Sequence, residues 1–236
     1  MSRIPAGVGP IALVMDVDST LIRDEVVELL AEHAGTREQV AEVTEAAMRG
    51  ELDFAASLRA RVATLEGLPV DVLEMVRSAV RLTPGARTLV TTLVEGGHVV
   101  GLVSGGFAEV VEPLAETLGI ETVRANALEV VDGRLSGQVL GDVVDQVAKA
   151  DFLTRLAAGA GVEEDRTVAV GDGANDLDMM AVAQLGIAFC AKPTVREQAD
   201  VVIDEPDLRR VLDVLGVEPL PQADDEGGHP LRPAMR

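Results

Sequence analysis

The chain has 236 residues, of which 40 are acidic and 20 are basic, and its formal net charge is −20. This charge repels nucleic acid and anionic membrane surfaces, and a chain without Trp or Tyr offers little for base stacking. We therefore expect a soluble protein with no nucleic-acid or membrane partner. A cytoplasmic location is expected because no apolar leader or membrane-spanning run is visible.

The first strong pattern is the apolar run of residues 11–15, which is followed by Asp16 and Asp18. Such an uninterrupted apolar run is typical of a buried strand in a parallel sheet. Because unpaired carboxylates are costly to bury, we expect Asp16 and Asp18 where this strand ends and the chain turns toward solvent. Open α/β sheets bind their ligands at that end. Only ten residues precede Ile11, so we expect no separate regulatory domain there.

Helical spacing replaces the strand pattern after Thr20. Helices are expected at about residues 26–34, 36–48, 53–66 and 70–80. Glycine and proline residues separate these helices, and no strand pattern interrupts the series. We interpret residues 22–82 as a small helical cap inserted into an α/β core that comprises residues 1–21 and 83–217.

Strands and helices alternate from Pro84 onward, which is typical of an α/β fold. Strands are expected at residues 98–103, 123–131, 134–140, 167–170, 186–190 and 200–203. The Asp132-Gly133 dipeptide predicts a β-hairpin between the second and third of these strands. The predicted fold class is therefore α/β, a Rossmann-like parallel sheet with an inserted helical cap and a β-hairpin. Residues 218–236, which are rich in proline and glycine, are expected to form a disordered tail.

Polar side chains follow three of the expected strands. They are Asp16 and Asp18 after the first strand, Ser104 after the second, and Asp172, Asn175 and Asp176 after a later one. Because the carboxyl ends of parallel strands meet at one edge of a sheet, we expect these groups to converge on one pocket. Several carboxylates in one cleft repel one another unless a hard cation such as Mg²⁺, which prefers oxygen ligands and bridges to phosphate, lies between them. The sequence therefore predicts a Mg²⁺-assisted phosphoryl site with the four aspartates as candidate metal ligands.

Each group at this site has an expected role. Asp16 leaves the strand first and is the candidate nucleophile, whereas Asp18 would protonate the leaving alkoxide and later deprotonate a water. Ser104 and the amide of Gly105 would hold phosphate oxygens at a helix N-terminus. Lys149, one of only two lysines in the chain, would bind the phosphate and offset charge in the transition state.

In order, spacing and strand context, these groups resemble motifs I to IV of the haloacid dehalogenase (HAD) superfamily of phosphatases over about residues 11–215. The segments that carry the resemblance are Asp16-Val17-Asp18-Ser19-Thr20, Ser104, Lys149 and Gly171-Asp172-Gly173-Ala174-Asn175-Asp176. Within the superfamily the chain is most similar to the phosphoserine phosphatase family, which has a small helical cap after motif I. The resemblance implies Mg²⁺-dependent hydrolysis of O-phospho-L-serine to L-serine and phosphate through an aspartyl-phosphate, the last step of serine biosynthesis.

The resemblance extends into the cap, where Glu25, Met48, Phe54 and Arg61 match the family's substrate pocket. It implies that Arg61 pairs with the seryl carboxylate through two hydrogen bonds and that Glu25 binds the ammonium group. Met48 and Phe54 would shield both from water, and Asn175 of motif IV would also contact the substrate. The expected partner is thus a small phosphate monoester, and the protein is expected to be a monomer or a homodimer.

Two other functions fit part of the pattern. A related cap-bearing enzyme would transfer the phosphoryl group to an acceptor such as homoserine, or hydrolyse another small phosphate, and motif I does not distinguish these. A receiver-type phospho-accepting module also uses an Asp, a hydroxyl residue and a Lys on a parallel sheet. Such a module needs neither a second acid like Asp18 nor a helical cap, so an enzyme is favoured.

Two residues near the end of the strand expected at 186–190 receive no chemical role. The lone cysteine, Cys190, excludes an internal disulfide, and its apolar neighbours predict a buried packing role. Lys192, which precedes Pro193, is expected on the surface.

Overall fold

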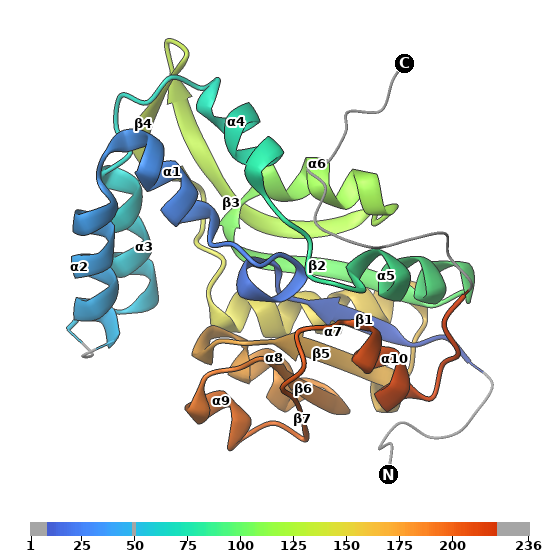
Figure 1. Ribbon diagram of the computed structural model, residues 1–236. Helices are drawn as coiled ribbons and strands as arrows, with labels where there is room; N and C mark the ends of the chain where they lie inside the picture. The colour runs from blue at the N-terminus through green and yellow to red at the C-terminus, as the bar shows by residue number, and fades with distance from the viewer. Residues whose placement is uncertain (1–8, 49–50, 221–236) are drawn as a thin grey trace, which may run out of the picture.

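The computed structural model describes residues 9–48 and 51–220, with the backbone alone for Glu45, Ala47 and Met48. A seven-stranded sheet lies at its centre in the order β4-β3-β2-β1-β5-β6-β7, parallel except for the antiparallel pair of β3 and β4 (Figure 1). The strands are β1 (Ala12–Met15), β2 (Val99–Phe107), β3 (Thr122–Val131), β4 (Arg134–Leu140), β5 (Thr167–Gly171), β6 (Leu185–Phe189) and β7 (Val201–Ile203). The predicted α/β fold with a parallel sheet and an edge hairpin is confirmed.

Helices cover both faces of the sheet and form a separate group after β1. The helices are α1 (Val26–Ala34), α2 (Arg37–Met48), α3 (Phe54–Ala63), α4 (Val72–Ala79), α5 (Ala86–Glu95), α6 (Ala108–Leu118), α7 (Gln146–Ala160), α8 (Leu177–Val182), α9 (Pro193–Arg196) and α10 (Arg209–Leu215). On one face α5 and α6 pack against β2, and α10 packs against α5. On the other face α7 contacts β1, β2 and β5 and lies beside α8.

Strand β1 is central because its side chains are apolar on both faces. It pairs with β2 on one side and β5 on the other, so that Met15 lies opposite Leu102 and Val170. Leu13 and Met15 enter the larger core cluster, whereas Val14 points into the cluster under α7. All three side chains are fully buried, and burial of each stabilises the fold by roughly 1.5–3 kcal/mol. The buried strand predicted at residues 11–15 is thus confirmed, and its carboxyl end carries Asp16.

Helices α1, α2 and α3 stand beside the carboxyl edge of the sheet (Figure 1). The segments entering and leaving this helical insertion lie side by side, because Ile22 and Leu82 form an antiparallel bridge. The β3–β4 hairpin supports the insertion from the other side, since Leu135 exchanges backbone hydrogen bonds with Gly67 and Leu68. The division into a cap at 22–82 and a core stays a prediction.

The structure corrects the expectation for Cys190. Strand β6 ends at Phe189, and Cys190 is exposed with a φ of +45°, so the predicted buried packing role is wrong. The chain turns there to bring the next residues back toward the sheet edge. Within the predicted tail, residues 221–236 lie outside the described residues, and the Leu220 N–H donates to Thr92 Oγ1. Among the helices described, none has the length and apolar character needed to cross a membrane.

Candidate active site

Three carboxylates meet at the carboxyl ends of β1 and β5. Asp16 follows β1, Asp172 follows β5, and Asp176 ends the short turn after it. One oxygen of each lies within 4.8 Å of the others. Asp16 and Asp176 are buried, while Asp172 is partly exposed toward the cavity. The convergence arises because β1 and β5 are neighbours in the sheet.

Lys149 of α7 lies under this cluster and is fully buried. Its Nζ donates to Asp16 Oδ1 over 2.5 Å and to Asp176 Oδ1 over 2.7 Å. Burial lowers the pKa of Lys149, but the two carboxylates outweigh it and hold that pKa above its usual range. Burial also raises the pKa of Asp16 well above its usual value, although Lys149 opposes the change.

The cluster fits a divalent cation on chemical grounds. Two ammonium groups, of Lys149 and Lys192, face the three carboxylates, so the cluster keeps excess negative charge. All the donor atoms are carboxylate oxygens, which hard cations such as Mg²⁺ and Ca²⁺ prefer. Asp16, Asp172 and Asp176 could therefore hold a divalent metal.

Asp18 lies next to the cluster of Asp16, Asp172 and Asp176, and its carboxylate has different hydrogen-bond partners. The Val26 N–H donates to Asp18 Oδ1 over 2.7 Å, and Ser104 Oγ donates to Asp18 Oδ2 over 2.9 Å. Burial, together with the charge of Glu25, raises the pKa of Asp18 to about 7. The group of three clustered carboxylates does not include Asp18, and its predicted metal contact stays a prediction.

At the end of β2 the backbone of Gly105 and Gly106 lies close to side chains of the site. Ser104 is fully buried, and its Oγ accepts the Gly106 N–H over 2.7 Å. A Cβ on Gly106 would lie 2.5 Å from Asp18 Oδ2, and a Cβ on Gly105 would lie 2.8 Å from the ring of Phe54. Only glycine leaves room for these approaches. The expected phosphate contacts of Ser104 and Gly105 stay predictions.

Asn126 of β3 is a site residue that the sequence analysis missed. It is buried, its Nδ2 donates to the Gly105 carbonyl over 2.9 Å, and its Oδ1 accepts the Val144 N–H over 2.8 Å. It thereby ties the end of β2 to the segment before α7, which carries Lys149. A polar residue within a predicted strand only weakly indicates a role in a site, and the sequence does not show which groups it binds.

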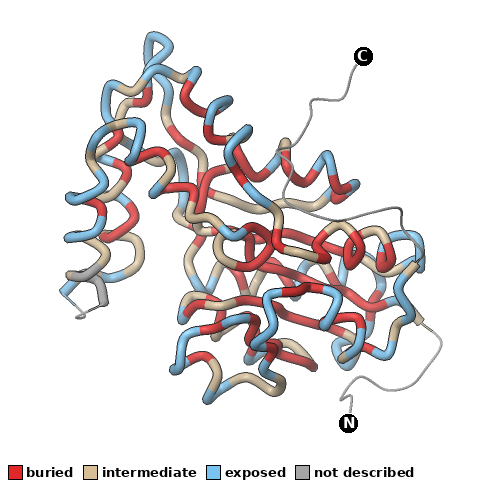
Figure 2. Tube along the Cα trace, in the orientation of Figure 1, coloured by how far each residue is buried: buried red, intermediate tan, exposed pale blue. Residues whose placement is uncertain are grey.

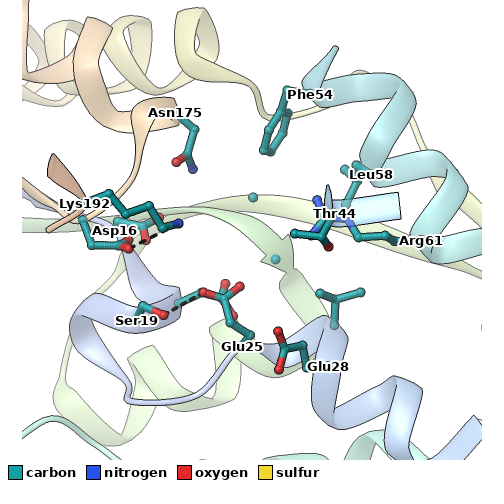
Figure 3. Close-up of a pocket in the computed structure, with 15 residues that line it drawn as sticks. Asp16, Ser19, Glu25, Glu28, Thr44, Phe54, Leu58, Arg61, Asn175 and Lys192 are labelled. Atoms are coloured by element: carbon teal, nitrogen blue, oxygen red, sulfur yellow. Dashed lines mark hydrogen bonds and ion pairs between the residues drawn. The ribbon is translucent and has the colours of Figure 1, made fainter. Parts of the chain in front are cut away.

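A cavity of about 360 Å³ opens above these groups. Figure 3 shows two charged side chains directed into it, Arg61 from α3 and Glu25, which is the residue before α1. Ser19 Oγ donates to Glu25 Oε1 over 2.7 Å, which orients that carboxylate. Burial lowers the pKa of Arg61, and the charge of Glu25 opposes the change.

The remaining predicted substrate residues are distributed along the same cavity. Phe54 and Asn175 line it, whereas the Met48 side chain lies outside what the structure describes. Lys192 also lines it, although the sequence analysis expected a surface residue without a role. Burial raises the pKa of Asp172 to about 6, and the nearby charge of Lys192 opposes the change.

Comparison with known proteins is informative over most of the chain. The family model of the haloacid dehalogenase-like hydrolases matches residues 13–181. A phosphoserine phosphatase of Streptomyces coelicolor is 57% identical over 227 residues, which are 94% of this chain and 55% of that protein. One from Streptococcus thermophilus is 53% identical over 203 residues, which are 86% of this chain and 94% of that protein. The chain thus spans about half the length of the first relative and nearly all of the second.

A solved structure described as a phospho-aspartyl intermediate analogue of phosphoserine phosphatase superposes with a TM-score of 0.81. Its sequence is 42% identical, and the match covers 86% of this chain and 98% of that one. The similarity therefore extends over most of this chain and nearly all of that one.

Proposed function

The chain belongs to the haloacid dehalogenase-like hydrolases, and we propose that it is a Mg²⁺-dependent phosphatase that hydrolyses O-phospho-L-serine to L-serine and phosphate. The observation that carries the proposal is the division of one cavity into two ends. The aspartates and Lys149 lie at the sheet edge. Glu25, Phe54 and Arg61 line another part of the cavity, which we call the cap wall. The first end suits a phosphate ester, and the second suits the ammonium and carboxylate groups of an amino acid. The relatives named phosphoserine phosphatase support the same substrate.

Asp16 is the proposed nucleophile of the first step. Its carboxylate attacks phosphorus, the bond from phosphorus to the seryl oxygen breaks, and an aspartyl-phosphate forms. Lys149 orients the attacking carboxylate through its 2.5 Å hydrogen bond and offsets negative charge. Asp18 donates a proton to the departing seryl oxygen, a role that its raised pKa suits.

The second step regenerates Asp16. Asp18, now deprotonated, takes a proton from a water that attacks the phosphorus of the aspartyl-phosphate. The bond between Asp16 and phosphorus breaks, which frees the carboxylate and inorganic phosphate. The hydrogen bonds from Val26 and Ser104 hold Asp18 in place for both proton transfers. The similar structure described as a phospho-aspartyl intermediate analogue supports this covalent route.

The proposed cofactor is Mg²⁺, which Asp16, Asp172 and Asp176 would hold, with Asp18 as the fourth expected contact. When bound, the ion supplies charge stabilisation to the phosphoryl oxygens. The oxygen-only donor set supports this choice.

The proposal also covers the setting in which the enzyme acts. A cytoplasmic location is supported by the absence of an internal disulfide in a chain with one cysteine and by an amino-acid substrate. A monomer or a homodimer remains the expected assembly.

Three related esters test the substrate. O-phosphoserine, O-phosphoethanolamine and 3-phosphonooxypropanoate share the phosphate, and the last two lack the carboxylate and the ammonium group respectively. We expect kcat/KM to fall roughly 100-fold or more for either analogue, because Arg61 or Glu25 then loses its charged partner inside the cavity. Similar kcat/KM values for all three would contradict the serine assignment and leave the phosphatase chemistry intact.

Cap variants assign the two recognition groups. Arg61→Ala should lower kcat/KM for phosphoserine and the deaminated ester but hardly change it for phosphoethanolamine. Glu25→Gln should instead lower kcat/KM more for the two esters with an ammonium group than for the deaminated ester. Equal losses on all esters would contradict these roles. Adding homoserine tests phosphoryl transfer, since phosphohomoserine formation outpacing phosphate release would contradict hydrolysis as the main reaction.

A further inference from the structure

We propose that Lys192 is a second phosphate-binding cation of this cavity, a role that rests on the proposed phosphatase function. Lys192 is the last residue before α9, and its N–H donates to the Asp172 carbonyl over 3.1 Å. Its side chain lines the cavity, and Figure 3 shows the amine directed inward. The ammonium group is thus anchored, through the backbone, to the loop that carries a candidate metal ligand. This places it at the phosphate end of the cavity.

The charges around the cavity explain why a further cation is needed there. The carboxylates that line it are Asp16, Asp18, Glu25, Glu28 and Asp172. Lys149 is fully buried, and its ammonium group already donates to two carboxylates. Arg61 enters from the cap wall instead. Even with Mg²⁺ bound to the aspartates, the five lining carboxylates and the net charge of −20 repel a phosphate dianion, so a further cation at the phosphate end favours its approach, and Lys192 supplies one.

The contact between Lys192 and Asp172 leaves the ammonium group available. Lys192 Nζ lies 3.8 Å from Asp172 Oδ2, which is longer than a direct hydrogen bond. The Lys192 side chain is 58% exposed. An ammonium group has three donors, so it can bind phosphate oxygens while it stays near Asp172.

The residue type supports the same role. Of the 20 basic residues only Lys149 and Lys192 are lysines, and both lie at this one site. An arginine beside Asp172 would favour a bidentate pair with that carboxylate, which would occupy its donors. The compact charge of a lysine leaves more of its donors to the substrate.

Lys192 would capture the ester and hold the phosphate before and after the reaction, without taking part in bond breaking. Because solvent screens a half-exposed charge, the effect should be modest. Lys192→Gln should raise KM for phosphoserine roughly three- to tenfold and weaken inhibition by inorganic phosphate by a similar factor, with kcat changed less than about twofold. It should also flatten the salt dependence of kcat/KM.

Arg155→Gln is the matched control. It removes the same unit of charge from an exposed position on α7, where Arg155 pairs with Asp151. Measured at saturating Mg²⁺, this variant should match the wild type, and Lys192→Arg should fall between the wild type and Lys192→Gln. Identical behaviour of Lys192→Gln and Arg155→Gln would overturn the proposal. So would a loss of kcat with KM and phosphate inhibition unchanged, because that result points to an effect through Asp172.

Amine labelling tests binding without turnover. Acetic anhydride should acetylate Lys192 but not Lys149, which is fully buried. Inorganic phosphate with Mg²⁺ should slow acetylation of Lys192 roughly threefold or more, as followed by peptide mass spectrometry, whereas acetylation of free lysine added as a reference should not change. No protection at inhibitory phosphate concentrations would overturn the proposal. A wrong serine assignment is distinguishable, since it would make kcat/KM similar for the three esters while the Lys192→Gln effect persisted on each of them.

Discussion

The floor and the cap wall of the cavity differ in how their side chains are held. The floor, which we define as Asp16, Asp18, Ser104, Lys149 and Asp176, contains two hydrogen-bonded groups, Lys149 with Asp16 and Asp176, and Ser104 with Asp18. The cap wall, defined as Glu25, Phe54 and Arg61, is partly exposed, and Glu25 is bound to Ser19. Figure 2 shows the same contrast, with buried chain concentrated on the sheet and mixed burial along α2 and α3.

This difference matches the two tasks of a phosphatase. The phosphate is the same in every ester, so its chemistry gains from buried, preorganised groups in a low-dielectric setting. In the proposed reaction the amino-acid end distinguishes one ester from another, and it would be recognised by Glu25, which precedes α1, and by Arg61 of α3. Changes in the floor should therefore affect all substrates, whereas changes in the cap wall should depend on the substrate.

The largest effect is expected for the nucleophile. Asp16→Asn should reduce kcat for every phosphate ester by roughly 10⁴-fold or more, because the amide does not form the aspartyl-phosphate. Initial rates on phosphoserine and on an aryl phosphate measure it, with circular dichroism as the folding control. Activity near that of the wild type would rule out the covalent route.

The next largest effect on kcat is expected at Gly106, whose backbone lies close to the floor residue Asp18. A Cβ at Gly106 would meet Asp18 Oδ2 at 2.5 Å, so Gly106→Ala should displace that carboxylate and lower kcat roughly 10- to 100-fold on all esters. Gly159→Ala is the control, because a Cβ there meets nothing within 4 Å. It should leave kcat unchanged and add roughly 0.5–1 kcal/mol to the free energy of unfolding. A loss confined to phosphoserine would break the distinction between floor and cap wall.

Metal binding should stabilise the floor. At about 100 times its dissociation constant Mg²⁺ should add roughly 2–3 kcal/mol to the free energy of unfolding, since it relieves repulsion among three carboxylates. Thermal unfolding with Mg²⁺ and with a chelator measures the shift in Tm, and Asp172→Asn should reduce it strongly. A shift that Asp172→Asn leaves intact would place the ion elsewhere.

The smallest effect is expected in the cap. The Asp53 side chain accepts the Ala56 N–H over 2.7 Å at the start of α3, and Asp53→Ala should cost about 1 kcal/mol of unfolding free energy. KM for phosphoserine should rise more than kcat changes, because α3 carries Arg61. Asp71→Ala is the control, since the Asp71 side chain makes no cap hydrogen bond at the start of α4. Urea unfolding that shows equal losses for both variants would argue against the capping role.

Much of the fold could be predicted from local patterns. The hairpin predicted from Asp132-Gly133 is confirmed, with Val131 opposite Arg134 and positive φ at both turn residues. Boundaries were less certain: β2 runs on to Phe107, beyond the predicted end at residue 103, because Phe107 still pairs with Asn126 of β3. The predicted burial of Cys190 is wrong for a related reason, because apolar neighbours do not show at which residue a strand ends.

Local sequence patterns were enough to predict the buried strand β1, the two carboxylates at its end, and the polar groups that follow later strands. These properties are local, because periodicity and turn residues report the burial of one element at a time. Only the tertiary structure decided that β5 lies beside β1, that Ser104 bonds to Asp18, that Asn126 holds Gly105, and that Lys192 reaches the cavity. Those contacts join residues far apart in the chain. They depend on strand order and packing, and a local sequence pattern does not report either.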